Sequence, residues 1–321
     1  ITPIQIKRKL KIYEGEFIME FNKLYNGNSI ELIKKINNDS IHLILSDIPY
    51  GIGYEDWDVL HNNTNSAFLG SSKAQEKAGS VFKRRGKPLN GWSEADKKIP
   101  FEYQQWCSSW ASEWLRVLKP GASVFIFAGR RMSHRCICAM EDAGFIFKDM
   151  ISWEKDSAPH RAQRISEVYK RRNDEINKEK WEGWRIGNLR PVFEPILWFQ
   201  KPYKLGATLA DNVINHEVGA FNDVLWNKYT INSQNIIKTK KEKGDHGLHP
   251  TQKPLLLMNA LIELTTLPGQ VVLDPFMGSG STCVAAKSLN RQYIGFELDK
   301  NYFDIAQDRI KKTNLQEKLD I

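Results

Sequence analysis

Two stretches of the chain combine residue types that could support group-transfer chemistry. The first is Asp47-Ile48-Pro49-Tyr50, which follows an apolar run at 40–45. The Asp47 carboxylate and the Ile48 carbonyl are two acceptors that could bind both N–H bonds of an aromatic amine and favour a more tetrahedral nitrogen. Pro49 confines Ile48 to extended conformations, which fixes the direction of that carbonyl, and Tyr50 offers a face to an unstacked base. The alternative is a strand that simply ends in a Pro-Tyr turn.

The second stretch runs from Asp274 to Thr282, where an apolar strand, a glycine-rich turn and a helix follow one another. Gly278 and Gly280 let the backbone pass close to a ligand at the carboxyl end of the strand, where open α/β sheets bind cofactors. Glu297 ends the next strand and could accept both hydroxyls of an adenosine ribose. Cys283 stands where a dinucleotide-binding turn has its third glycine, which disfavours NAD. The sequence contains no phosphate loop of the form GxxxxGK[ST].

The elements that must position these residues alternate along the chain. Apolar runs predict strands at 40–45, 122–128, 145–153, 193–200, 271–273 and 291–297. Helical spacing predicts helices at 101–118, 132–143, 255–264 and 281–289, and Lys119-Pro120-Gly121 is typical of a helix exit. Strands that alternate with helices predict an α/β fold with a mainly parallel sheet.

Taken together, the two stretches resemble the amino-methyltransferases of restriction-modification systems, which carry an Asp-Pro-Pro-Tyr signature and a Phe-x-Gly-x-Gly loop. The order of the motifs, with the tetrapeptide first, resembles the permuted β class of that family. The segments 24–30 and 249–254 are similar to stretches that contact the cofactor in the family. Ile48 replaces the usual first proline, and Asn28 replaces the usual acid. The resemblance covers roughly residues 20–53, 101–153 and 247–310.

This resemblance implies a Rossmann-like S-adenosylmethionine-dependent methyltransferase fold, with a mostly parallel sheet, helices on both faces and an inserted target-recognition region. It implies a site-specific enzyme that methylates a flipped base in double-stranded DNA. In the family, Asp at the first motif position goes mostly with adenine N6 and Ser mostly with cytosine N4, so adenine is expected. The implied catalytic residues are Asp47, Ile48, Pro49 and Tyr50. The implied cofactor-binding residues are Asn28, Ser29, Asp47, His249, Thr251, Lys253, Asp274, Phe276, Gly278, Ser279, Gly280, Ser281, Thr282, Glu297 and Asp299.

Segments outside these motifs are the candidates for contacting DNA. The chain has 46 Lys and Arg against 38 Asp and Glu, and its net charge of +8 is compatible with a polyanionic partner. We expect a catalytic and cofactor-binding domain at 20–153 and 247–315, an inserted target-recognition region at 154–246, and a mobile DNA-contacting loop at 54–100. The residues expected to contact DNA are Lys83, Arg84, Arg85, Arg161, Arg164, Arg171 and Arg172.

Other functions stay open at this point. An N4-cytosine methyltransferase would bind its target amine in the same way, with a motif that begins with Ser. RNA and protein-glutamine methyltransferases usually have a motif that begins with Asn. Because Ile48 and Asn28 depart from the family pattern, a DNA-binding homologue with reduced catalysis is a third alternative. C5-cytosine methylation is excluded because none of the four cysteines follows a proline.

The remaining expectations concern metals, partners and location. No metal-ligand set is visible, and four cysteines without a C-x-x-C pair are typical of reduced thiols in a cytoplasmic protein. No apolar run is long enough to span a membrane, and the N-terminus lacks a secretory pattern. We expect a monomer or homodimer, with a cognate restriction endonuclease as a possible partner.

Overall fold

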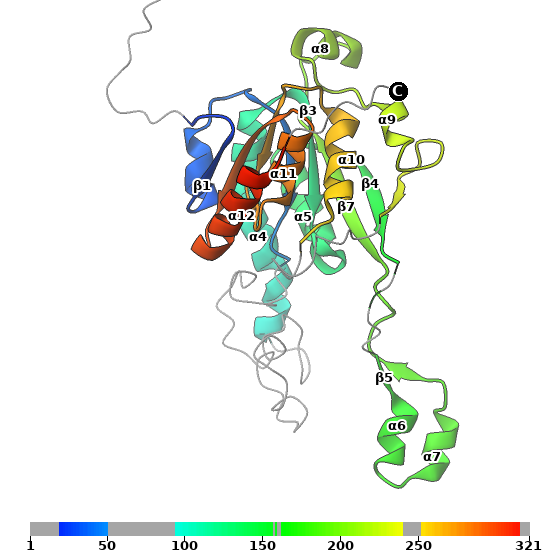
Figure 1. The fold of residues 1–321 in the computed structure, drawn as a ribbon. Coiled ribbons are helices and arrows are strands. Elements are labelled where there is room, and N and C mark those ends of the chain that lie inside the picture. Colours follow the sequence, from blue (N-terminus) through cyan, green and yellow to red (C-terminus); the bar gives the residue numbers. More distant parts are fainter. Residues whose placement is uncertain (1–18, 51–93, 157, 159–161, 240–251, 315–321) are drawn as a thin grey trace, which may run out of the picture.

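An eight-stranded sheet organises the chain (Figure 1). The computed structural model describes residues 19–50, 94–156, 158, 162–239 and 252–314. In spatial order the strands are β1 (Lys23–Asn26), β10 (Gln292–Glu297), β9 (Val271–Asp274), β2 (Ile41–Asp47), β3 (Leu118–Phe127), β7 (Phe193–Gln200), β4 (Ile146–Glu154) and β8 (Ile236–Lys238). The five strands from β1 to β3 run parallel, β7 is antiparallel to both of its neighbours, and β8 is parallel to β4. The predicted α/β fold with a mainly parallel sheet is confirmed.

Helices cover both faces of the sheet (Figure 1). One face packs against α1 (Ser29–Leu32), the 3-10 helix η1 (Ile33–Lys35), α4 (Glu94–Val117) and α5 (Gly129–Asp142). The other packs against α10 (Leu255–Thr265), α11 (Ser281–Ser288) and α12 (Lys300–Lys312). Along β2, Ile44 joins the first apolar cluster while Leu43 and Leu45 join the second. Burial on both faces explains why Leu43, Ile44 and Leu45 are apolar in succession.

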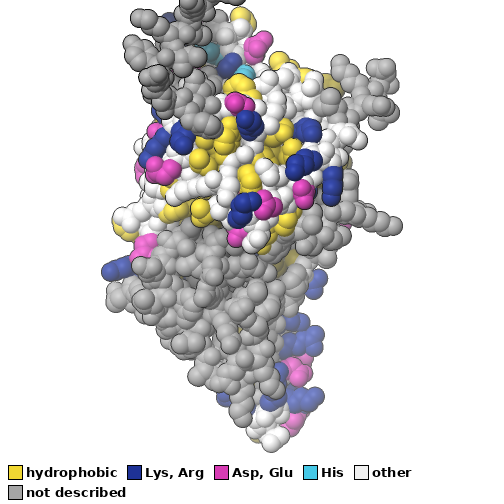
Figure 2. Space-filling model, turned by 60° about the vertical axis from the view of Figure 1, so that its left-hand side comes forward, with side chains coloured by type: hydrophobic (Ala, Val, Ile, Leu, Met, Phe, Trp, Pro, Cys, Tyr) yellow, Lys and Arg dark blue, Asp and Glu magenta, His cyan; other side chains and the backbone are white. Residues whose placement is uncertain are grey.

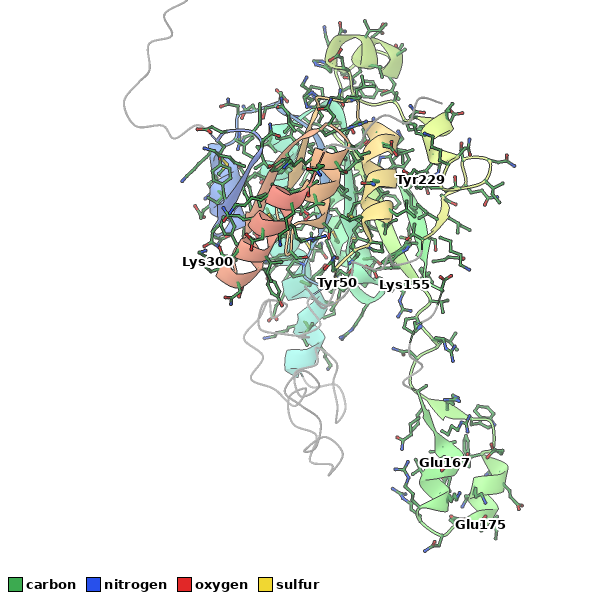
Figure 3. The ribbon with its side chains drawn as sticks, viewed as in Figure 1. Tyr50, Lys155, Glu167, Glu175, Tyr229 and Lys300 are labelled. Atoms are coloured by element: carbon green, nitrogen blue, oxygen red, sulfur yellow. The ribbon has the colours of Figure 1, made fainter. Side chains whose placement is uncertain are left out.

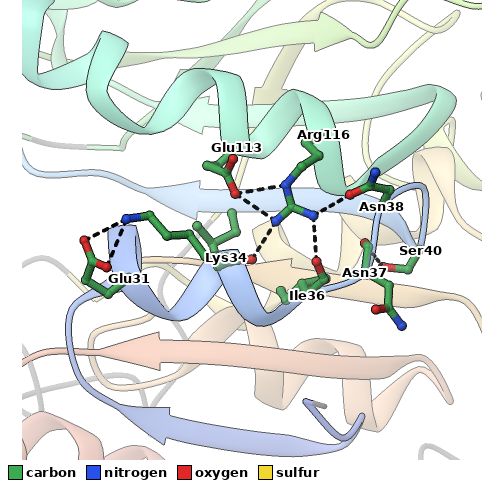
Figure 4. A network of polar contacts seen from close by, with 9 residues as sticks. Glu31, Lys34, Ile36, Asn37, Asn38, Ser40, Glu113 and Arg116 are labelled. Atoms are coloured by element: carbon green, nitrogen blue, oxygen red, sulfur yellow. Dashed lines mark hydrogen bonds and ion pairs between the residues drawn. The ribbon is translucent and has the colours of Figure 1, made fainter. Parts of the chain in front are cut away.

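A network of polar contacts around Arg116 fixes the segment that precedes β2 (Figure 4). The Arg116 guanidinium donates to the Ile33 carbonyl at 3.0 Å, the Ile36 carbonyl at 2.7 Å and the Asn38 side chain at 2.6 Å, and it pairs with Glu113 at 2.8 Å. Because Arg116 lies in α4, these bonds join that helix to the turn before β2. The start of the strand that carries Asp47 is thereby held against its neighbour.

Two predicted boundaries differ from the structure. Helix α4 begins at Glu94, inside the segment expected to be a loop at 54–100; residues 51–93 of that segment lie outside the described residues. Helix α4 ends at Val117, within one residue of its predicted end, but Lys119-Pro120-Gly121, predicted as the helix exit, already lies within β3, because the strand begins directly at Leu118. The register between β2 and β3 shifts there, so proline and a glycine with φ +81° are accommodated in an irregular stretch of the strand.

The predicted inserted region at 154–246 does not form one separate unit. Strands β7 and β8 belong to the main sheet, because their apolar side chains pack in its core. Helices α8 (Leu209–His216) and α9 (Asp223–Trp226) lie at the upper end of the molecule in Figure 1. Among the described residues of this region, 162–190 form an arm that projects from the body and is built from β5 (Gln163–Arg164), α6 (Ile165–Lys170), α7 (Glu175–Lys180) and β6 (Arg185–Ile186).

Candidate active site

Three neighbouring parallel strands end at one edge of the sheet and bring three carboxylates together. Asp47 ends β2, Asp274 ends β9 and Glu297 ends β10. A cavity of about 400 Å³ lies at this edge and is lined by all three residues. Open α/β sheets bind ligands at the carboxyl ends of their strands. The sequence stretches around Asp47 and Asp274, distant in the chain, therefore face one cavity.

The glycine-rich turn between β9 and α11 has a backbone that other residues adopt poorly. Gly278 has φ +52° and Gly280 has φ +82°, and a Cβ on Gly280 would lie 2.9 Å from the Ala306 Cβ of α12. The Arg309 guanidinium donates to the Ser279 carbonyl at 2.6 Å. Glycine is needed both for the left-handed conformation and for the close packing of α12. The turn is thus held in place before any ligand binds.

Glu297 is fixed by the same turn. Its carboxylate accepts the Gly278 N–H at 2.9 Å and the Asp299 N–H at 2.7 Å. Burial raises the pKa of Glu297, and these two backbone donors partly offset the rise. Asp299 itself accepts the N–H groups of Asn301 and Tyr302, so it caps the start of α12.

Asp274, the first residue of the glycine-rich stretch, is buried and contacts the strand that carries Asp47. Its carboxylate accepts the Ser46 hydroxyl at 2.7 Å and the Phe276 N–H at 3.1 Å. Burial raises its pKa to about 7 despite these donors, and the charge of Asp47 adds to the rise. The Ser46 bond ties the strand that carries Asp47 to the start of the glycine-rich turn.

Asp47 belongs to a cluster of five polar side chains. The Tyr50 hydroxyl donates to Asp47 Oδ1 at 2.9 Å, and the Lys253 ammonium contacts Asp47 Oδ2. The same hydroxyl contacts Glu194 Oε1, and Lys253 Nζ lies 3.3 Å from that oxygen. Lys155 Nζ pairs with the other Glu194 oxygen at 2.5 Å. Every charge in this cluster has a partner of opposite sign.

The two carboxylates of the cluster titrate differently. Burial raises the pKa of Asp47; Lys253 opposes the rise and the charge of Glu194 adds to it. Burial also disfavours the charged form of Glu194, but Lys253 and Lys155 outweigh it and hold its pKa to about 2. For Lys253, burial is outweighed by its two carboxylate partners, so its pKa is raised. Glu194 is therefore the constant negative charge, and Asp47 is the carboxylate that can change its protonation.

Tyr50 is held from both sides. Its ring lies against Gly129, where a Cβ would be 2.9 Å from ring atoms. Burial raises the pKa of its hydroxyl well above the ordinary value, so the hydroxyl keeps its proton. The Tyr103 hydroxyl donates to the Pro49 carbonyl at 3.2 Å. Figure 3 places Tyr50 and Lys155 at the same lower edge of the body, near the base of the arm.

Most of the predicted site residues gather around this cavity. Those that line it are Asn28, Ser29, Asp47, Ile48, Pro49, Tyr50, Lys253, Asp274, Phe276, Gly278, Ser279, Ser281, Thr282 and Glu297. Asn28 also caps α1 by accepting the Ile30 N–H at 3.0 Å. Gly280 and Asp299 do not line the cavity but support it, through packing against α12 and through the cap of that helix. His249 and Thr251 lie outside the described residues.

The predicted DNA-contacting residues lie elsewhere. Arg164, Arg171 and Arg172 are exposed on the arm. The other four, Lys83, Arg84, Arg85 and Arg161, lie outside the described residues. Within 162–190 there are eight Lys and Arg against five Asp and Glu. Basic side chains are visible along the lower edge of the view in Figure 2.

Sequence reasoning missed several residues of the site, among them Glu194, Trp106 and Met258. Glu194 is the one charged residue of an otherwise apolar strand, and that isolation was an available signal, because a buried carboxylate needs partners. Trp106 of α4 lines the cavity and packs on Phe276 with ring centroids 5.5 Å apart. Met258 of α10 also lines the cavity. No pattern distinguishes those two from ordinary core residues.

The part of the chain that the structure describes holds neither a metal-ligand cluster nor a membrane-spanning helix. Among these residues no group of three or more His, Cys, Asp or Glu side chains could hold a metal ion. Likewise, none of the helices there is both long and apolar enough to cross a membrane.

The chain is similar to DNA methyltransferases in sequence and in structure. A family model described as DNA methylase matches residues 41–308. The type II methyltransferase M.HindIII of Haemophilus influenzae is 60% identical over 91% of this chain and 96% of its own length. M.HinfI, also from Haemophilus influenzae, is 27% identical over 91% of this chain and 68% of its own length.

Solved structures share the fold. The PvuII DNA methyltransferase, described as cytosine-N4-specific, has a TM-score of 0.60 at 18% identity and covers 93% of this chain and 89% of its own. The M1.HpyAVI complex with S-adenosylmethionine has a TM-score of 0.52 at 23% identity, covering 90% of this chain and 98% of its own. These likenesses support the predicted methyltransferase fold.

Proposed function

The chain belongs to the DNA methylase family, and we propose that it transfers a methyl group from S-adenosylmethionine to the N6 amine of adenine in double-stranded DNA. Membership confirms the sequence-based prediction of a DNA methyltransferase. The observation that carries the proposal is that Asp47 and Tyr50 share one cavity with the glycine-rich turn and Glu297. The Asp47 carboxylate and the Ile48 carbonyl, which could bind an aromatic amine, thus share the cavity with the glycine-rich turn and Glu297, which could bind the adenosine of the cofactor.

The residues of the cavity fit S-adenosylmethionine. A volume of about 400 Å³ lies within the roughly 300–1,000 Å³ typical of ligand pockets. The Glu297 carboxylate accepts two backbone N–H groups. Because an ionised carboxylate has about four acceptor positions, it can also accept hydrogen bonds from the two ribose hydroxyls. Trp106 and Met258 add apolar walls. When bound, S-adenosylmethionine supplies an electrophilic methyl group on a sulfonium and leaves as a neutral thioether.

The protein's own residues act on the target amine. The Asp47 carboxylate accepts one N–H of the amine and the Ile48 carbonyl accepts the other, which directs the nitrogen lone pair out of the ring and toward the methyl carbon. The Tyr50 ring stacks on the flipped base. After transfer, the nitrogen carries a surplus proton, and Asp47, whose pKa is raised by burial, accepts it.

The arm is the proposed DNA-reading element. It projects downward from the body in Figure 1, from the side on which Figure 3 labels Tyr50, and Arg164, Arg171 and Arg172 on it are exposed. Arginine side chains suit both phosphates and guanine edges. Lys83, Arg84 and Arg85 complete the proposed contacts. We further propose that the enzyme protects DNA from a cognate restriction endonuclease and acts as a monomer or homodimer.

The experiment follows labelled methyl into DNA. Incubation of double-stranded DNA with the enzyme and labelled S-adenosylmethionine, digestion to nucleosides and mass separation should give N6-methyladenine. Asp47→Ala should reduce the rate about 100- to 1,000-fold, because it removes a preorganised acceptor. N4-methylcytosine as the main product would overturn the proposed target base. Turnover of Asp47→Ala within a few-fold of wild type would overturn the role of Asp47.

A further inference from the structure

Glu194 reaches the catalytic edge through an antiparallel strand. Asp47 of β2 is paired with Phe127 of β3, and Phe127 is paired with Ile196 of β7. Because β7 runs opposite to β2, the beginning of β7 lies where β2 ends. Glu194, two residues before Ile196, therefore enters the site from a strand whose apolar sequence gives no catalytic motif.

Glu194 and Asp47 share the same two partners. The Tyr50 hydroxyl and the Lys253 ammonium each contact both carboxylates. The side chains of Lys253 and Glu194 are only 6% and 10% exposed, so water offers them little alternative pairing. Both Asp47 oxygens have a protein partner in this arrangement.

This sharing bears on the work proposed for Asp47. An ionised carboxylate has about four acceptor positions, so Asp47 accepts an amine N–H while Tyr50 and Lys253 leave one of those positions open toward the cavity. If the target amine displaces either donor, that group needs another partner. A phenol has one proton and donates it to one carboxylate at a time. A released hydroxyl or ammonium left buried without a partner would be unfavourable. Glu194 already lies within reach of both groups.

We propose that Glu194 is a positioning residue of methyl transfer, which keeps the Tyr50 hydroxyl and the Lys253 ammonium in place while Asp47 binds the target amine. The inference rests on the proposed function of Asp47 and Tyr50. Lys155 holds the far oxygen of Glu194 at 2.5 Å, so the carboxylate cannot simply follow Lys253 toward Asp47.

The charges around Asp47 give this role a measurable signature. Asp47 is faced by Tyr50 from its own segment, Lys253 from the segment before α10, Glu194 from β7 and Asp274 from β9. The negative charge of Glu194 raises the pKa of Asp47. Removing that charge lowers the pKa of Asp47, so Asp47 stays ionised at lower pH. A purely structural residue would not shift this titration.

The central test compares Glu194→Gln with wild type. The variant should lose about 10- to 100-fold in kcat, the range for a lost hydrogen bond to a charged group, with KM for DNA and the calorimetric Kd for S-adenosylmethionine little changed. The acid limb of the kcat–pH profile should move to lower pH. Glu263→Gln is the matched control, because Glu263 accepts a hydrogen bond of 2.6 Å from the Tyr229 hydroxyl at a place away from the site. This variant should keep the wild-type kcat and the wild-type pH of the acid limb.

A second variant covers the case in which Glu194→Gln does not fold. Glu194→Asp keeps the charge but shortens the reach, so kcat should be intermediate and the acid limb should stay at the wild-type pH. Wild-type kcat in either variant would overturn the proposal, as would an unmoved acid limb in a folded Glu194→Gln. The assay counts labelled methyl groups on any base. If the wild-type enzyme methylates cytosine, the proposed target base is wrong, but the comparison of the Glu194 variants with wild type remains valid. Wild type without any transfer would overturn the proposed function itself.

Discussion

Two carboxylates, the partly buried Asp47 and the buried Glu194, are held next to each other by one ammonium and one hydroxyl. Like charges at this distance repel, and burial adds a desolvation cost, so the pair is stable only because Lys253 and Lys155 balance it. The two carboxylates differ in their partners. Glu194 pairs with two lysines, which hold its pKa to about 2, whereas burial and the charge of Glu194 raise the pKa of Asp47.

A single glycine sets the position of Tyr50, and its replacement is a sharp test. Gly129 has φ +61°, and a Cβ there would lie 2.9 Å from the Tyr50 ring. Gly129→Ala should cost about 1–3 kcal/mol of unfolding free energy from backbone strain. It should also displace Tyr50 and lower kcat at least several-fold. Urea unfolding and the methyl-transfer assay measure the two effects.

The matched control for that variant is Gly206→Ala. Gly206 has φ +81°, and nothing lies within 4 Å of a Cβ built there. It should therefore lose similar stability and keep kcat. If Gly129→Ala loses no more kcat than Gly206→Ala, contact with the Gly129 backbone does not position Tyr50.

At the scale of elements, the sequence predicted what depends on local pattern. The run at 40–45 became β2, and strand, glycine-rich turn and helix appeared in order as β9 and α11. The role of β7 could not be predicted, because its antiparallel insertion between β3 and β4 depends on long-range pairing. Glu194 was missed for that reason.

The structure of the arm and the place of residues 119–121 in a strand were not predicted, for different physical reasons. The sequence predicted an inserted region at 154–246 but not the internal structure of the arm, because the arm folds around short contacts such as the Trp181–Trp184 pair, with ring centroids 5.5 Å apart. Proline and glycine at 119–121 correctly predicted the end of the preceding helix, but not that these residues already belong to β3, because the irregular pairing of β3 with β2 tolerates both residue types in a strand.

The arm supplies the prediction at this scale. Replacing Arg171 and Arg172 by Ser should weaken binding to cognate and random DNA about equally if they contact phosphates. The slope of log affinity against log salt should fall by up to about 0.9 for each lost contact. Fluorescence anisotropy over a salt series measures both quantities. Neutralising Lys204 and Lys228, which are exposed near α8 and α9, is the control and should change little. Unchanged affinity in the arm variant would remove these arginines from the interface.

At the scale of the whole molecule, the cavity joins parts that fold together only in the native state. Its lining comes from both sides of the sheet, through Trp106 of α4 and Met258 of α10, and from the ends of three parallel strands. An unfolded chain does not reproduce that arrangement. A ligand of this cavity therefore binds the folded state alone and stabilises it by mass action.

S-adenosylmethionine at 100 times its Kd should add about 2.7 kcal/mol to the free energy of unfolding. For a protein of this size that corresponds to a rise in Tm on the order of 5 °C, measurable by scanning calorimetry. Glu297→Gln should lose most of the rise at the same cofactor concentration, because an amide binds ribose hydroxyls less strongly than a carboxylate. Glu167→Gln, on the arm (Figure 3), should keep it, since Glu167 lies far from the cavity. A full rise in Glu297→Gln would show that this carboxylate does not hold the ribose, and that the adenosine binds through the backbone of the glycine-rich turn instead.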